Sequence, residues 1–195
     1  MHIRYIVTIL LGLLLTGCLT DDGGSNFHYV HVEAIDAFTF DEQMEYAVGD
    51  TIFFTQKFSR YLKEDGYSEL LDIYETTDDE AFSYYFGLQQ FSEFSNAYED
   101  VYVDPEYIVT SVENTADNYP YSNYAVTAIL NEAENAYESN VGVILREGGA
   151  FRLDLSYVSF NNQSSYYRGE GVSLNIKHRF TNPDNAYLEF KVVEQ

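Results

Sequence analysis

The sequence predicts an all-β fold, an antiparallel β-sandwich of about eight strands with one or two short helical elements. Apolar residues recur mainly at every second position, which is the period of a strand that buries one face. Aromatic residues make up 17% of the chain and stand in these runs beside Val, Ile and Thr, which also favour strands. Clusters of Gly, Asn, Asp and Pro separate the runs without a βαβ rhythm, as in an antiparallel meander.

Three strands are expected in the N-terminal half, at residues 29–35, 51–58 and 81–88. The second follows a Gly-Asp turn and is rich in aromatic and β-branched residues. The residues assigned to a buried face are Val30, Val32 and Ala34 in the first run and Phe82, Tyr84, Phe86 and Leu88 in the third. The same alternation leaves His31, Glu33 and Ile35 on the opposite face of the first strand.

The segments between these strands are less regular. Residues 59–79 have no clear period and are expected to be a long connection with one short helix near 68–74. The Thr77–Glu80 pattern is that of a capping box, which starts helices, but the period-two spacing directly after it favours a turn at Asp78. Residues 92–100 fit either a short helix or a loop.

The C-terminal half contains the remaining strands. Pro105 limits a strand within 106–112 to an edge or a strand start, since proline has no N–H for the ladder. Polar residues around Pro120 predict a loop, and residues 131–137 are a turn region that also contains good helix formers. The other strands are expected at 124–130, 139–145, 151–160, 171–180 and 187–193.

Residues 48–54 and 148–155 resemble strand openings in immunoglobulin-like domains of exported bacterial proteins. The resemblance implies an immunoglobulin-like sandwich, although the two segments cover only about fifteen residues. The chain has no Trp and a single Cys, so it lacks the Trp and the disulfide that mark true immunoglobulin domains. The fold prediction therefore depends mainly on the alternation.

The N-terminus has the layout of a secretion signal. Arg4 precedes an apolar run, residues 6–15, that is too short to span a bilayer, which needs roughly 20 apolar residues. Leu15-Thr16-Gly17-Cys18 follows, and with this motif the chain resembles bacterial lipoproteins, which implies cleavage before Cys18 and lipidation of its thiol. We therefore expect a signal peptide over 1–17, a flexible tether over 18–27 and a single β-sandwich domain over 28–195. An ordinary cleaved signal and an uncleaved anchor helix are the alternatives.

Cys18 is the only cysteine, so it cannot form an internal disulfide. Lipidation accounts for the presence of a single thiol in an exported protein. Each buried methylene of an acyl chain contributes roughly 0.8 kcal/mol, so several chains anchor durably. We expect attachment to the cell envelope through this lipid, at the outer membrane. Asp21 and Asp22 resemble an acidic signal for export to the cell surface, and they equally fit a soluble linker.

The charge balance excludes one class of partner. Removing residues 1–17 takes away Arg4 and no acid, which leaves nine basic and 32 acidic side chains and a net charge of −23. Such a surface repels phosphate backbones, so we expect no nucleic-acid partner. The aromatic content argues against disorder, and the length suits a single core.

The sequence contains no catalytic motif, and we expect no enzymatic activity, no cofactor and no metal. His28 and His31 are three apart, which on a strand places them on opposite faces, and His178 is expected to face solvent between two cations. The acidic runs at 78–80 and 99–106 lack the EF-hand pattern, so we expect solvated loops rather than calcium sites.

Tyrosine occurs 19 times, and tyrosines are well suited to exposed recognition surfaces. Tyr119, Tyr121 and Tyr124 lie in a polar loop and are the expected contacts to an unknown protein or glycan ligand. The sequence thus predicts a lipid-anchored, non-enzymatic envelope protein that acts as a binding or accessory module. The alternatives are a carbohydrate-binding or nutrient-capture lipoprotein and a hydrolase that uses a carboxylate pair.

Overall fold

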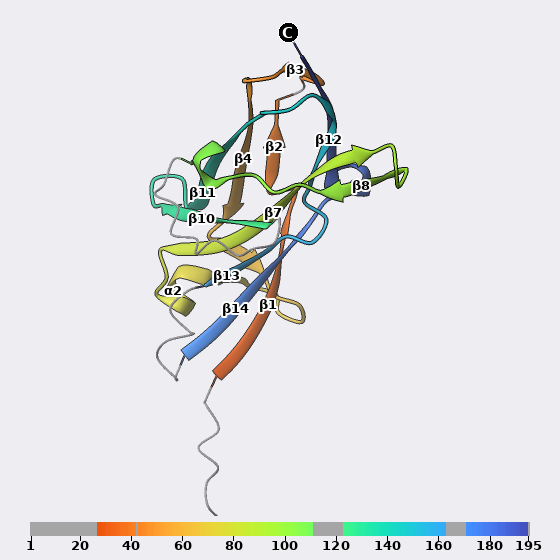
Figure 1. Ribbon diagram of the computed structural model, residues 1–195. Coiled ribbons are helices and arrows are strands. Elements are labelled where there is room, and N and C mark those ends of the chain that lie inside the picture. Colours follow the sequence, from red (N-terminus) through yellow and green to blue (C-terminus); the bar gives the residue numbers. More distant parts are fainter. Residues whose placement is uncertain (1–26, 42, 111–122, 163–170, 195) are drawn as a thin grey trace, which may run out of the picture.

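The computed structural model describes residues 27–41, 43–110, 123–162 and 171–194, and these residues form an almost entirely β fold (Figure 1). Within those ranges, helix is limited to α2 (Ile73–Thr77) and two 3₁₀ turns, η1 (Pro105–Tyr107) and η2 (Pro183–Ala186). The strands are β1 (Phe27–Ile35), β2 (Phe38–Phe40), β3 (Glu45–Ala47), β4 (Thr51–Ser59), β5 (Tyr61–Lys63), β6 (Leu70–Asp72), β7 (Ala81–Ser92), β8 (Ala97–Asp100), β9 (Ile108–Thr110), β10 (Asn123–Asn131), β11 (Ala136–Ile144), β12 (Gly149–Asp154), β13 (Ser159–Asn162), β14 (Gly171–Arg179) and β15 (Tyr187–Val193). The all-β prediction is confirmed.

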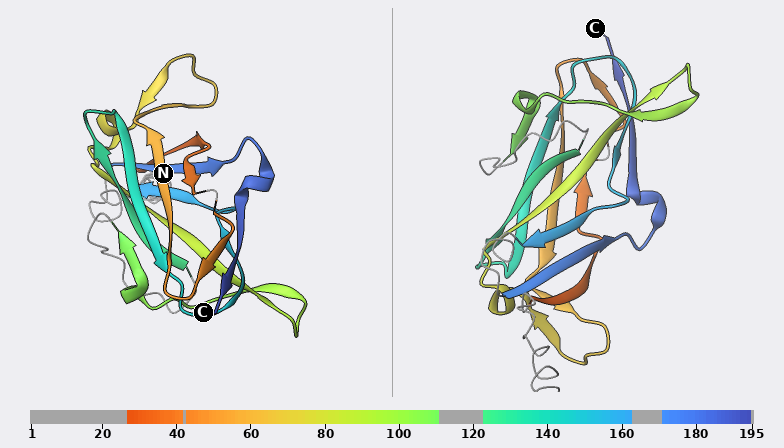
Figure 2. Two further views of the ribbon diagram at one scale, coloured as in Figure 1. Left: turned by 90° about the horizontal axis from the view of Figure 1, so that it is seen from above. Right: turned by 60° about the horizontal axis from the view of Figure 1, so that its bottom comes forward.

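Thirteen of the described strands belong to one mixed sheet, which curls over on itself (Figure 2). Its central path runs β1-β14-β13-β7-β10-β11-β4-β2, while β5 and β6 form a separate hairpin. The curl brings strands that are far apart on this path, such as β4 and β13, face to face as two layers. The long strand β7 lies between them on the path and changes neighbours along its length. Its first part pairs with β10 and β13, and its second part pairs with β12 and β8. The β7–β8 hairpin projects from the body in all views (Figures 1 and 2).

Residues 27–40 connect the two ends of the curled sheet. In this segment β1 pairs in parallel with β14, and β2 pairs in antiparallel with β4. The chain bends between them at Asp36, whose φ of +50° lies in the left-handed region. The Asp36 carboxylate fixes the bend because it accepts hydrogen bonds from the Thr181 N–H at 2.8 Å and from its hydroxyl at 2.6 Å. Next to it, the Ala37 carbonyl accepts a hydrogen bond from the Lys57 N–H, so one continuous segment belongs to both edges.

The predicted alternation appears in the burial of the strands. Val30, Val32 and Ala34 of β1 are buried, as are the four residues assigned to the inner face of β7. The two layers meet through aromatic rings: Phe58 of β4 and Phe160 of β13 have ring centroids 4.5 Å apart. Each fully buried aromatic or aliphatic side chain stabilises the fold by roughly 1.5–3 kcal/mol. The core therefore follows from the period-two pattern.

His178 corrects a sequence prediction, because it does not face solvent but is buried, with 4% of its surface exposed. It shares the inner face of β14 with Leu174 and Ile176, and Phe180, directly after the strand, continues the same period of two. Its Nε2 accepts a hydrogen bond from the Ala37 N–H at 3.2 Å. Burial lowers the pKa of His178 to about 4, so the ring is neutral at pH 7.

The strand pairing differs from the expected meander in its details. Two parallel pairs, β1 with β14 and β15 with β3, add to the antiparallel pairing. The strand expected at 151–160 is divided into β12 and β13 by a turn in which the Val158 N–H bonds to the Leu155 carbonyl. The unexpected strands β2, β3, β5, β6 and β8 are three or four residues long, too short to show a period.

The prediction of short helical elements in a β fold is confirmed, but the helix lies further along the chain than expected. The helix expected at 68–74 begins only at Ile73, because residues 70–72 form β6 and Asp72 is the N-cap of α2. The expected turn region near 131–137 is confirmed, with the turn itself at residues 132–135 between β10 and β11, whereas residues 92–100, expected as a short helix or a loop, belong to the β7–β8 hairpin. The turn at Asp78 is confirmed, because this residue ends α2 with a φ of +55°.

Candidate binding pocket

A pocket of about 280 Å³ lies where the chain leaves β8 and passes through η1 toward β9. The connection between β11 and β12 forms its other wall. The residues that line it are Leu88, Val101, Tyr102, Val103, Asp104, Tyr107, Ile144, Leu145, Arg146, Glu147 and Phe151. These positions come from three separate parts of the chain, and the sheet brings them together.

The floor of the pocket is apolar. Leu88, Leu145 and Phe151 are almost completely buried, and Val103 is 8% exposed. Leu88 and Phe151 are inner-face residues of the paired strands β7 and β12, so the alternation of those strands directs both side chains to this place. The floor is therefore part of the hydrophobic core and offers a dry surface to a ligand.

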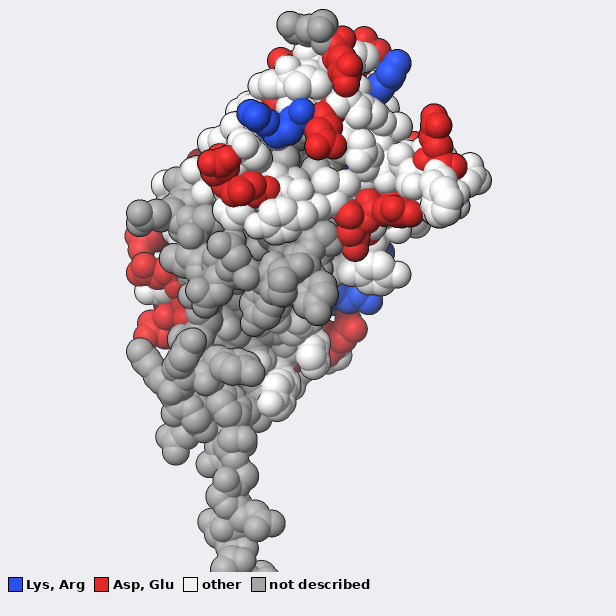
Figure 3. Space-filling model, viewed as in Figure 1, with Lys and Arg blue, Asp and Glu red and all other residues white. Residues whose placement is uncertain are grey.

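A single cation stands at the rim. The Arg146 guanidinium lies 4.6 Å from the centre of the Tyr107 ring, which is a cation–π contact. Asp104 and Glu147 also line the pocket, so the rim carries both signs of charge. Arg146 is exposed, and acidic side chains outnumber basic ones on the described part of the face drawn in Figure 3.

The loop that carries Tyr107 is held in place by its own hydrogen bonds. Pro105 occupies the first turn of η1, and the Asp104 side chain accepts a hydrogen bond from the Glu106 N–H at 3.2 Å. The Tyr107 N–H in turn donates to the Asp104 carbonyl at 2.9 Å. A hydrogen bond to the Glu106 carboxylate, helped by partial desolvation, raises the pKa of Tyr107, so its hydroxyl stays protonated.

This arrangement suits binding of a small molecule. The buried floor accommodates an apolar group, while the guanidinium, the phenols and the carboxylates at the rim offer partners for a polar or anionic group. The ionisable groups in the lining are the carboxylates of Asp104 and Glu147, the phenols of Tyr102 and Tyr107, and the Arg146 guanidinium.

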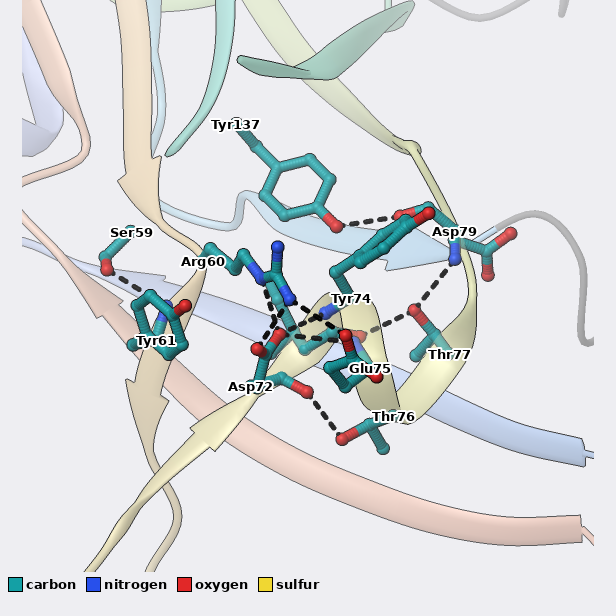
Figure 4. A network of polar contacts seen from close by, with 11 residues as sticks. Ser59, Arg60, Tyr61, Asp72, Tyr74, Glu75, Thr76, Thr77, Asp79 and Tyr137 are labelled. Atoms are coloured by element: carbon teal, nitrogen blue, oxygen red, sulfur yellow. Dashed lines mark hydrogen bonds and ion pairs between the residues drawn. The ribbon is translucent and has the colours of Figure 1, made fainter. Parts of the chain in front are cut away.

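A second arginine, Arg60, forms an ion pair and a cation–π contact with neighbouring side chains (Figure 4). It donates from Nε and Nη2 to the two Asp72 carboxylate oxygens at 2.7 and 2.6 Å, and its guanidinium lies 4.8 Å from the Tyr74 ring centre. The Asp72 carboxylate also caps α2 by accepting from the Tyr74 and Glu75 N–H groups at 3.1 Å. The ion pair with Arg60 lowers the pKa of Asp72, and the cluster joins β4 to α2 as a structural contact.

The site residues expected from the sequence are only partly placed by the structure. Cys18, Tyr119 and Tyr121 lie outside the described residues. Tyr124 lies on β10, where it is paired with Phe86 of β7, and its side chain is likewise outside the description. Lipid attachment at Cys18 and ligand binding by the tyrosine loop therefore stay predictions.

The other polar candidates are distributed over the fold. His31 is exposed on β1, and His28 belongs to the same strand, although its side chain is outside the description. Asp78 ends α2, whereas Asp79 is buried and accepts a hydrogen bond from the Asn162 amide at 2.9 Å. Within the described part of the chain, no three His, Cys, Asp or Glu side chains form a group that could hold a metal ion. Across the same ranges, no helix has the length and apolar character that a membrane crossing requires.

The sequence reasoning missed Arg146 and Tyr107. Each lies in a short segment without a recognisable motif, and nothing in one sequence shows that the two segments meet. The one available signal was the Asp-Pro pair before Tyr107, which predicts a capped turn and hence a fixed position for this ring.

Comparisons with known proteins yield weak similarities. No protein-family model matches the chain, and a search among curated proteins finds no match. Among solved structures, the chain is similar to the reeler domain of human F-spondin, with 13% identity, a TM-score of 0.32 and coverage of 91% of this chain and 99% of that one. It is also similar to a PapD-like domain of human CEP192, with 9% identity, a TM-score of 0.28 and coverage of 91% and 89%.

A third similarity is to AggA, the major subunit of aggregative adherence fimbriae type I from Escherichia coli, with 11% identity, a TM-score of 0.31 and coverage of 79% and 99%. All three are β-sandwich domains. At TM-scores near 0.3 these similarities concern the general arrangement of strands, and we base no functional argument on them.

Proposed function

We propose that this protein is a lipid-anchored, non-enzymatic protein of the cell envelope that binds a small ligand in the pocket beside Arg146. The anchor is inferred from the resemblance of Leu15-Thr16-Gly17-Cys18 to lipoprotein processing sites and from the absence of any other cysteine. Outer-membrane attachment, with exposure at the cell surface, belongs to the same proposal.

One observation carries the binding function. A cation in cation–π contact with Tyr107 lines the same pocket as a group of buried apolar side chains. Such a pairing of one fixed charge with an apolar cavity orients an amphipathic ligand, because its polar end and its apolar end have separate partners. The ligand class that fits is a small molecule with a carboxylate or another oxyanion at one end and an apolar body.

A carbohydrate ligand is the second candidate, and Tyr102 favours it. Tyr102 lines the pocket with 59% of its surface exposed, so its ring is free to stack on a sugar face. Asp104, Glu147 and Arg146 stand around it and supply acceptors and donors for hydroxyl groups. On this proposal the protein captures glycans or nutrients at the envelope.

The anchor is tested by substituting Cys18→Ala and separating membrane from soluble fractions. We expect the wild-type protein in the membrane fraction and the variant in the soluble fraction, and mass spectrometry of the mature wild-type protein is expected to show acyl chains on its first residue. An unmodified N-terminus, or a variant that stays on the membrane, contradicts the anchor without affecting the pocket.

The pocket is tested with a glycan array and with a library of small apolar carboxylates, screened by thermal shift. Arg146→Gln is expected to abolish carboxylate binding, and Tyr102→Ala is expected to abolish glycan binding. Arg152→Gln is the matched control, because Arg152 also stacks on tyrosines, with its guanidinium 4.3 Å from the Tyr98 ring centre, and it does not line the pocket. Binding that Arg146→Gln and Arg152→Gln weaken equally, or that neither pocket variant weakens, contradicts the proposal.

A further inference from the structure

A second hollow, of about 460 Å³, runs along the outer face of β1 and β14 beside the β5–β6 hairpin. We call it the basic groove. Its polar lining includes His31, Glu33, Lys63, Asn175, Lys177 and Arg179. None of these residues lines the pocket beside Arg146, so the groove is a separate feature.

The strand register builds this lining. Because β1 and β14 are parallel, His31 lies beside Asn175, Glu33 beside Lys177, and Ile35 beside Arg179, all on one face of the sheet. An isolated bridge between Val32 and Glu64 places the β5–β6 hairpin along the free edge of β1. Lys63, the residue before Glu64, thereby faces the same hollow.

Basic side chains are concentrated in the groove. The structure describes eight Lys and Arg residues, and three of them line this one hollow. Glu33 and Asp65 also line it, so three cations stand against two carboxylates. In a chain with 32 acidic and ten basic residues, a hollow with a surplus of cations runs against the general charge and focuses the field on anions.

Two of these cations are available for a ligand. Neither Lys63 nor Lys177 forms an ion pair with a described residue, and both side chains are exposed. Arg179 donates from Nε to Glu33 at 2.9 Å, which leaves its other N–H groups uncommitted in the described structure. By contrast, Lys57 and Arg60 are bound to carboxylates.

We propose that the basic groove binds a phosphate group. Ammonium and guanidinium groups are pure donors. The Asn175 amide donates one N–H to Asn161 Oδ1 at 2.9 Å and has a second N–H, so the lining of the groove offers several donors to an oxyanion. A phosphate, with two to four free oxygens and one or two charges, accepts hydrogen bonds from several such donors, whereas one arginine already satisfies a carboxylate. The phosphate is either free or carried on a lipid headgroup of the membrane, since both present the same chemistry.

The test uses the complete mature protein in an uncharged detergent, which keeps it soluble with or without a lipid anchor. Amide NMR signals are followed while inorganic phosphate or the water-soluble lipid dihexanoylphosphatidylglycerol is added at constant ionic strength. Signals of residues 31–35 and 175–179 are expected to shift with either probe. The double variant Lys63→Gln/Lys177→Gln is expected to bind at least about tenfold more weakly, because two charged hydrogen bonds are lost.

Lys57→Gln/Lys191→Gln removes the same charge outside the groove and is the matched control. Its affinity is expected to stay close to that of the wild type. Tighter binding of phosphate than of the lipid supports a free phosphate as the ligand, and the reverse supports a headgroup. The proposal is overturned if neither probe shifts these signals, or if the two double variants bind equally well.

Discussion

The buried His178 predicts a loss of stability in mild acid. In the unfolded chain this imidazole takes up a proton near its ordinary pKa of 6.5, whereas in the folded protein burial lowers its pKa to about 4. Between these two pH values the unfolded state binds a proton that the folded state does not. Stability therefore falls as the pH decreases from about 6.5 to about 4, and His178 causes no pH dependence above that range.

The size of the effect follows from the difference in pKa. One pKa unit corresponds to about 1.36 kcal/mol, so His178 lowers the free energy of unfolding by about 3 kcal/mol over this range. The surroundings explain why the shift is large. The ring is packed edge-on against Phe38 and Phe180, with centroids 4.9 and 4.2 Å away, and its Nε2 already accepts the Ala37 N–H. The nearby carboxylate of Asp36 opposes the shift only in part.

The assay is urea unfolding of the wild type and of His178→Leu at several pH values from 7.5 to 4. At pH 7 the variant is expected to be less stable by about 1–3 kcal/mol, because the Ala37 N–H loses its buried acceptor. The stability of the wild type relative to the variant is expected to fall by about 3 kcal/mol on acidification, since only the wild type carries the titrating ring, so that at pH 4 the variant is as stable as the wild type or more stable. Carboxylates titrate in both proteins, so their contribution cancels in this comparison.

His31→Leu is the control, because His31 is exposed on the outer face of β1. This variant keeps the buried His178 ring and is therefore expected to keep the acid-induced loss of about 3 kcal/mol. A difference between wild type and His178→Leu that stays constant from pH 7 to pH 4 refutes the reasoning, as does an NMR titration that finds His178 protonated at pH 6.

Three further predictions concern stability. Tyr137→Phe removes a buried hydroxyl that donates to the Asp79 carbonyl at 2.7 Å, so urea unfolding is expected to show a loss of about 1–2 kcal/mol, and an unchanged midpoint would argue against this bond. Phe160→Ala empties the centre of the aromatic core and is expected to cost about 3–5 kcal/mol, whereas a loss below about 1 kcal/mol would mean that the layers do not meet at this ring. Removing calcium with a chelator is expected to leave the thermal midpoint unchanged, because no three acidic or other ligating side chains among the described residues form a group that could hold a metal ion, and a lower midpoint would identify a calcium site.

The sequence predicted the strands that are long enough to show their period. The inner faces of β1 and β7 could be assigned residue by residue, because seven or more residues of alternation leave little ambiguity. The solvent-facing position predicted for His178 was wrong because it was inferred from the adjacent Lys177 and Arg179. The residues on the same face of the strand, Leu174 and Ile176, are buried and predict the burial of His178. On a strand, the residue two positions away predicts the environment better than the adjacent one.

The parallel pairing of β1 with β14 was beyond local reasoning. It joins residues about 145 positions apart in the chain, and strand periodicity is the same for parallel and antiparallel neighbours. The bend at Asp36 was hidden for the same reason, since its left-handed conformation is stabilised by Thr181 from the far end of the domain. Both features depend on long-range contacts, and a single sequence does not record them.

The location of the candidate pocket follows from a change of partner along β7. Pairing with β10 ends at Gly87, and pairing with β8 begins at Gln89, so Leu88 lies at the point where one neighbour is replaced by another. The chain leaving β8 crosses this point, with the Val101 N–H bonded to the Leu88 carbonyl, and then turns away through η1. A core side chain is thus left beneath a loop instead of beneath a strand. The pocket therefore lies where an irregular segment, instead of a strand, covers a buried core side chain, and such segments commonly carry binding residues on a rigid scaffold.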